Sequence, residues 1–142
     1  MALKNNQPRV IELPKICDPR GNLTFAQTLD QVPFEIARTF WLYDVPADAE
    51  RGGHSLKGTD QLLVALAGSL DVNLFDGYSW QRVTLNRPYR ALYIPAGLWR
   101  TLDNFTSGSV CLVLASEPYS EEEYIRDFDS YKQYAAEFDP RL

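Results

Sequence analysis

The feature of this sequence that most constrains its fold is a series of short apolar or alternating segments separated by turn residues. Runs of this kind, interrupted by Pro, Gly, Asn and Asp, are typical of β-strands joined by tight turns. Roughly nine of them follow one another with no helical period between them, which favours a jelly roll or barrel over a parallel sheet. We expect strands at 10–13, 23–29, 36–45, 61–67, 70–75, 80–85, 90–94, 99–104 and 110–115.

A different pattern begins at Ser120. The glutamates at 121–123 complete a capping box and place acidic residues where a helix N-terminus favours them. Apolar residues then recur at near-helical spacing, namely Ile125, Phe128, Tyr131, Ala135 and Phe138. We therefore predict a C-terminal helix at about 120–138 that packs on the barrel or on a partner subunit. Because no internal repeat or linker is visible, we predict a single domain over 1–142, with its barrel at about 8–117.

Charge and composition narrow the class of protein. The net charge is −5 and the Lys and Arg residues are scattered, which argues against a general nucleic-acid binder. The first residues lack the apolar region of a signal peptide, and no stretch approaches the length needed to span a membrane. Cys17 and Cys111 lie far apart without metal-type spacing, so we interpret both as reduced cysteines of a cytoplasmic protein.

The only histidine of the chain, His54, precedes the apolar run at 61–67. One imidazole cannot build a metal site of three or four ligands, but it can transfer a proton near neutral pH. The sequence therefore indicates metal-free proton chemistry, or a barrel that binds a ligand without turning it over. In a third interpretation His54 is a packed, hydrogen-bonded structural residue.

The surroundings of His54 resemble the first metal-binding motif of the cupin superfamily of β-barrels, which has two histidines, a glutamate and a glycine. The corresponding residues here are His54, Leu56, Gln61 and Gly68. The second cupin motif has Pro-x-Gly followed by a histidine and an asparagine. The corresponding residues here are Pro95, Gly97, Arg100 and Asn104. This resemblance implies an all-β cupin jelly-roll barrel, to which the C-terminal helix is added.

Three of the four ligand positions in that frame have changed, to Leu56, Gln61 and Arg100. A guanidinium at a ligand position repels a cation, so we predict neither a metal nor another cofactor. Positive charge replaces the ligands. The cationic residues near the motifs and turns are Arg20, Arg38, Arg51, Lys57 and Arg100. If three of them converge, they form an anion site. The alternative is that most of them are solvated surface residues. This alternative applies least to Arg100, because the motif directs that residue inward.

Five segments together give a closer resemblance, namely 18–23, 33–38, 51–54, 95–99 and 124–128. The chain resembles the sugar-nucleotide 3,4-ketoisomerases that act on dTDP-4-keto-6-deoxyglucose. The string at 124–128 is the most distinctive, since neither barrel nor helix packing requires it. The resemblance implies a metal-free protein that forms a homodimer through exchanged N-terminal strands and binds a thymidine diphosphate sugar.

The resemblance also implies an activity. His54 would remove the C3 hydrogen beside the C4 ketone, giving an enediol, and return the proton at C4. Arg100 and other arginines would stabilise the enediolate and hold the diphosphate. The implied substrate-binding residues are Arg20, Arg38, Arg51, Lys57, Gln61 and Trp99, the last by stacking on a base or sugar ring.

Three positions depart from the family pattern. The family usually has histidine at Leu56 and tyrosine at Phe40, and some members have histidine at Arg100. Loss of a polar group at Leu56 and of a hydroxyl at Phe40 removes two proton donors. The alternative function is therefore a catalytically impaired or re-purposed cupin that binds a nucleotide sugar, and a further one is another acid–base reaction such as epimerisation.

Overall fold

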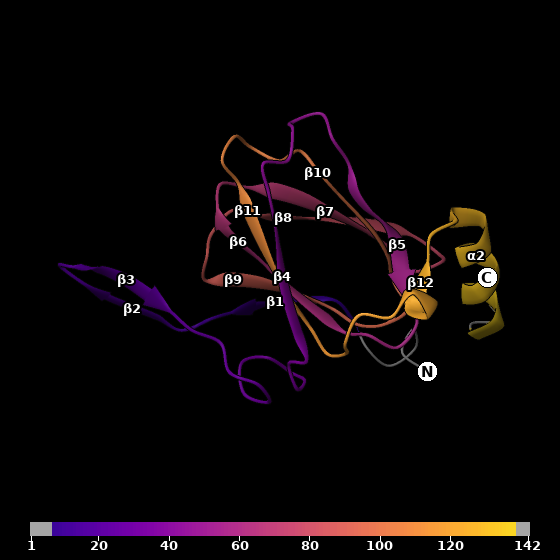
Figure 1. Ribbon diagram of the computed structural model, residues 1–142, viewed down its shortest axis with the longest axis horizontal. Helices are drawn as coiled ribbons and strands as arrows, with labels where there is room; N and C mark the ends of the chain where they lie inside the picture. The colour runs from indigo at the N-terminus through magenta and orange to yellow at the C-terminus, as the bar shows by residue number, and fades with distance from the viewer. Residues whose placement is uncertain (1–6, 139–142) are drawn as a thin grey trace.

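The computed structural model describes residues 7–138 and consists mainly of two antiparallel β-sheets (Figure 1). The first sheet has the order β1 (Arg9–Glu12), β9 (Arg90–Ile94), β6 (Gln61–Ala67), β11 (Val110–Ala115), β4 (Arg38–Tyr43). The second has the order β12 (Tyr124–Ile125), β5 (Arg51–Leu56), β10 (Trp99–Asp103), β7 (Leu70–Phe75), β8 (Trp80–Leu85). The predicted jelly roll is confirmed, and among the described strands the two sheets form an open sandwich rather than one closed hydrogen-bonded barrel.

Each of the nine predicted segments contains a strand, and three further strands occur. One is β2 (Lys15–Asp18), which forms a hairpin with β3 (Gly21–Thr24). The other two are β5 and β12. The sequence did not indicate β5 as a strand because Gly52, Gly53 and His54 lack the apolar alternation on which strand prediction depends.

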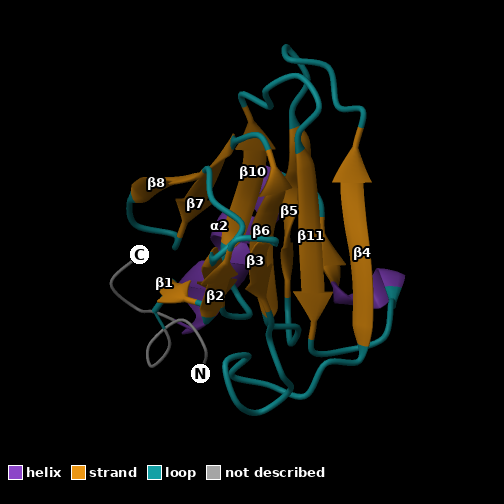
Figure 2. Ribbon diagram, turned by 90° about the vertical axis from the view of Figure 1, so that its left-hand side faces the viewer, coloured by secondary structure: helices purple, strands orange, loops and turns teal. Residues whose placement is uncertain are grey.

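The main core lies between the two sheets and is made by the inward residues of alternating strands. On β7, for example, Leu70, Val72 and Leu74 are buried while the residues between them are partly exposed. These side chains pack in one cluster with residues of β6, β9, β10 and β11. Partly buried Phe40 and Leu42 of β4 pack against that cluster, and β4 itself forms an edge of the first sheet beside β11 (Figure 2).

The C-terminal segment differs from the prediction. The α-helix α2 (Phe128–Phe138) begins at residue 128 rather than near 120, and residues 121–123 form a single 3₁₀ turn. Ser120 makes no side-chain capping hydrogen bond. The cap is Asp127, whose carboxylate accepts a hydrogen bond of 2.9 Å from the Ser130 amide. Residues 124 and 125 pair instead with β5 as strand β12.

Helix α2 lies beside β5 and β12 at one end of the second sheet (Figure 1). Tyr131 and Ala135 are fully buried there against Trp99 of β10, so the expected packing of the helix on the barrel is confirmed. The hairpin of β2 and β3 projects from the opposite end of the molecule (Figure 1). In the described part of the chain, no helix has the length and apolar character needed to cross a membrane.

Candidate active site

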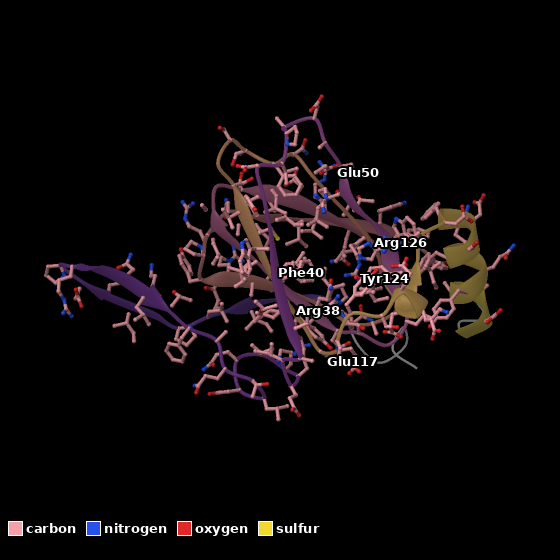
Figure 3. The ribbon with its side chains drawn as sticks, viewed as in Figure 1. Arg38, Phe40, Glu50, Glu117, Tyr124 and Arg126 are labelled. Atoms are coloured by element: carbon pink, nitrogen blue, oxygen red, sulfur yellow. The ribbon has the colours of Figure 1, made fainter. Side chains whose placement is uncertain are left out.

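A cavity of about 390 Å³ opens between the two sheets, and three residues of the two cupin-like motifs line it, namely His54, Gln61 and Arg100. Strands β4, β5, β6, β10 and β11 line it, together with the segment 124–126. In Figure 3 the labelled side chains of Arg38 and Phe40 come from β4, and those of Tyr124 and Arg126 lie across from them near β5. His54, Arg51, Gln61 and Arg100 all line this cavity.

A β-bulge directs His54 into the cavity. His54 pairs with Arg100 and Gly52 pairs with Thr101, so Gly53 is an extra residue in β5. Gly52 has φ of +81°, and a Cβ atom at this position would lie 3.1 Å from the Arg100 carbonyl oxygen. Glycine is required by both the backbone conformation and this close approach. The bulge therefore places His54 and Arg100 opposite each other on the inner face.

The environment of His54 keeps its imidazole neutral. The pKa of His54 is lowered from 6.5 to about 4, with burial as the largest cause and the positive charge of Arg100 as the next. Arg126 and Arg38 act in the same direction as Arg100. A neutral imidazole near physiological pH accepts a proton, which is the state that a general base requires.

Arg100 is a buried cation without an anionic partner. Its side chain is only 1% exposed. Its Nη1 donates a hydrogen bond of 2.6 Å to Gln61 Oε1, and its Nη2 donates one of 3.2 Å to the Leu98 carbonyl oxygen. Burial lowers the pKa of Arg100 to about 10, which still leaves it charged at neutral pH. Since an unpaired buried charge is costly, this arrangement is suited to binding an anionic group.

Three polar atoms in this region have no hydrogen-bond partner among the described residues. They are His54 Nδ1, Gln61 Nε2 and Arg100 Nε. Buried polar atoms of folded proteins are nearly always satisfied. Their concentration in one cavity therefore indicates a place where the oxygen atoms of a ligand complete the hydrogen bonding.

Two more of the predicted cationic residues belong to this region. Arg51 lines the cavity itself. Arg38 is partly buried at the start of β4, has an unpartnered Nε, and holds its guanidinium 5.3 Å from the Phe40 ring. Arg51 and Arg100 thus line the cavity and Arg38 lies near it, and none of the three takes part in the ion pairs found within residues 7–138.

The other three predicted residues lie elsewhere. Trp99 is on the opposite face of β10 from Arg100, where it is buried against α2. Lys57 is exposed and lies outside the cavity lining. Arg20 is at the tip of the β2–β3 hairpin, 90% exposed and paired with Asp18 at 2.9 Å. Within a single chain, the structure does not bring these side chains to the cavity.

The sequence analysis did not assign Tyr124 and Arg126 to the site, although both line the cavity. The ring of Tyr124 lies 4.9 Å from the ring of His54 at an angle of 62°. The Arg126 guanidinium stacks 4.3 Å from the Tyr124 ring and is fixed by Glu121, with 2.8 Å between Nε and Oε1. The sequence signal for these two residues was the distinctive segment 124–128, which helix packing does not require. The first two residues of that segment form β12.

At the two positions that lack the expected polar group, the structure shows apolar packing. Leu56 is fully buried two residues after His54, and Phe40 lines the cavity. Among residues 7–138, no three His, Cys, Asp or Glu side chains come together as a metal site requires. The arrangement joins one neutral base, a buried guanidinium and further arginines, which suits proton transfer on an anionic substrate.

Known proteins are similar to this chain in sequence and in structure. The model of the family described as "FdtA: WxcM-like, C-terminal" matches residues 6–136. A TDP-4-oxo-6-deoxy-alpha-D-glucose-3,4-oxoisomerase of Aneurinibacillus thermoaerophilus is 39% identical over 128 residues, which cover 90% of this chain and 92% of that protein. A crystal structure of a sugar 3,4-ketoisomerase of Thermoanaerobacterium thermosaccharolyticum in complex with TDP has a TM-score of 0.91 at 37% identity, covering 93% of this chain and 96% of that chain. A 3,4-ketoisomerase of Helicobacter canadensis has a TM-score of 0.88 at 38% identity, covering 90% and 96%.

Proposed function

Because the chain belongs to the sugar-nucleotide 3,4-ketoisomerase family, we propose that it interconverts the 4-keto and 3-keto forms of a dTDP-linked 6-deoxyhexose. One observation supports this most strongly: a neutral imidazole, His54, lies beside the buried guanidinium of Arg100 on one wall of a cavity. The conversion is internally balanced, because C3 is oxidised from alcohol to ketone while C4 is reduced from ketone to alcohol. It therefore requires no external oxidant or reductant.

His54 acts as the base in this proposal. The C4 ketone acidifies the C3 hydrogen, and the neutral imidazole takes that proton. The electron pair of the C3–H bond forms the C3=C4 double bond, and negative charge moves to the C4 oxygen. The protonated imidazole then delivers a proton to C4. One base serves both carbons because adjacent carbons lie within reach of a single imidazole when the transfers occur on one face of the sugar.

Arg100 stabilises the negative oxygen of the enediolate. Its guanidinium is already desolvated and held by Gln61 and the Leu98 carbonyl, so it needs no reorganisation when charge develops. The unpartnered Arg100 Nε and Gln61 Nε2 supply free donors for substrate oxygens. In the same proposal Arg38 and Arg51 hold the diphosphate by paired contacts.

We also propose a homodimer formed through exchanged N-terminal strands. The hairpin exposes apolar side chains, with Ile16 54% and Leu23 56% exposed. An apolar hollow of about 530 Å³ lies on the outer face of the first sheet and is lined in part by β2–β3 residues, Val64 and Leu112. A second copy of the hairpin packing there would cover both surfaces. In such a dimer Arg20 would contact substrate only across the interface.

The proposed cytoplasmic location rests on the sequence alone.

The experiment is a conversion assay with purified protein and dTDP-4-keto-6-deoxyglucose, followed by NMR of the nucleotide sugar. We expect the 3-keto product from the wild type and no product from His54→Asn, which preserves the shape of the side chain while removing its basicity. Binding of dTDP without any product would instead support the alternative of a binding cup. No binding and no product would exclude both functions.

A further inference from the structure

The proposed isomerisation moves two kinds of proton, and His54 accounts for only one of them. His54 takes the proton from C3 and, after that proton exchanges with solvent, delivers a proton to C4. A second proton must leave the C3 hydroxyl and reach the C4 oxygen, because the ketone moves from C4 to C3. Leu56 and Phe40 carry no group able to move it, although the family resemblance places an imidazole and a phenol at these positions.

Strand β12 brings a different hydroxyl to this place. Tyr124 pairs directly with Leu56, and residues opposite each other in an antiparallel pair share one face of the sheet. The phenol ring therefore lies beside Leu56 and contacts the His54 ring at 4.9 Å. Tyr124 and Arg100 line the same cavity.

The ring of Tyr124 is held from its other sides. The Arg126 guanidinium lies 4.3 Å from the ring and the Tyr119 ring 5.6 Å from it. Among the described residues that line the cavity, Tyr124 carries the only hydroxyl group. The side chain is thus fixed against the base and directed to the region where the enediolate forms.

On the basis of the proposed function, we propose that Tyr124 is a second catalytic residue, which transfers the hydroxyl proton between the C3 and C4 oxygens. After His54 has taken the C3 proton, the Tyr124 phenol donates its proton to the negative C4 oxygen and accepts the proton of the C3 hydroxyl. The electron pair left on the C3 oxygen forms the C3 ketone, the C3=C4 bond opens, and C4 takes the proton from His54. Both residues return to their starting states.

Apart from His54 and Tyr124, Glu50 is the lining residue that carries an acid–base group, and its position is less suitable. Its side chain is exposed at the rim of the cavity. It also borders a second hollow on the outer surface, beside Trp80 and Arg82. Tyr124 differs from Glu50 in its ring contact with His54.

The test compares two rates in deuterium oxide for Tyr124→Phe, a change that retains the ring and its packing. One rate is deuterium entry at C3 of recovered substrate, which needs only His54, and the other is formation of the 3-keto product. We expect product formation to fall by about a hundredfold or more, the usual contribution of an acid–base group, while deuterium entry at C3 stays within about threefold of the wild type. The matched control is Tyr78→Phe, which makes the same change at a side chain that is 69% exposed on the β7–β8 turn.

Three results would overturn the inference. If Tyr124→Phe forms product at a rate within about threefold of the wild type, the phenol does not transfer the hydroxyl proton. An equal loss of both rates would show that Tyr124 only positions His54. Wild-type protein that gives neither product nor deuterium would overturn the isomerase function itself, and the transfer through Tyr124 with it.

Discussion

His54 is the only histidine among 142 residues, so its protonation can be followed without interference from another imidazole. The structure predicts that this side chain stays neutral far below the pH at which a solvated histidine takes up a proton. The pKa of His54 is lowered from 6.5 to about 4, chiefly by burial and next by the positive charge of Arg100. At pH 5.5 a solvated histidine would be about one-tenth neutral, whereas we expect His54 to be more than about nine-tenths neutral.

The same shift has a consequence for stability. The unfolded chain binds this proton below about pH 6.5, whereas the folded chain binds it only near pH 4, so protonation of His54 favours unfolding in that interval. Folding stability is therefore predicted to fall as the pH drops from about 6.5 to about 4. The two pKa values differ by 6.5 − 4, which corresponds to about 3 kcal/mol.

The assay is NMR of protein labelled with ¹³C and ¹⁵N in histidine, recorded between pH 8 and pH 5. The imidazole shifts should remain those of the neutral ring down to pH 5.5. In Arg100→Met the pKa of His54 should rise and yet remain below 6.5, because burial is the larger cause. A midpoint at or above 6.5 in the wild-type protein would refute the argument that His54 is a desolvated neutral base.

Three further changes test other parts of the account. Arg100→Met should reduce turnover about 100- to 1,000-fold in a kinetic assay, because the cation that stabilises the enediolate is lost. A melting curve should show unchanged or higher thermal stability, since an apolar side chain replaces a buried unpaired cation. Gly52→Ala should destabilise the fold by about 1–3 kcal/mol in urea, more than Gly53→Ala, because only the Gly52 Cβ meets the backbone at 3.1 Å; equal losses would contradict the contact. Leu23→Lys should convert a dimer to monomers in sedimentation analysis, and an unchanged mass would remove the hairpin from the interface.

Much of the fold was predictable because strand alternation and turn residues act locally. The motif frame also placed His54, Gln61 and Arg100 at one cavity. Trp99, which we predicted to bind substrate, lies on the other face of β10, because adjacent strand residues face opposite sides and a strand that directs Arg100 inward directs Trp99 outward. Its indole is buried against α2 instead.

The missed residues depended on long-range pairing. The acidic run at 121–123 suggested a helix start, but the pairing of Tyr124 with Leu56 turned the following residues into a strand. Hydrogen bonds between segments so distant in the chain leave no local periodicity in the sequence. The bulge in β5 is likewise defined by its partner strand β10, which is why the sequence did not indicate a strand there.

The most direct test of the central claim is an NMR time course of purified wild-type protein with dTDP-4-keto-6-deoxyglucose in deuterium oxide. The account predicts a 3-keto sugar that carries deuterium at C4, formed at a rate that His54→Asn abolishes. Product formation by His54→Asn at the wild-type rate would contradict it, because the lone imidazole would then not be the base.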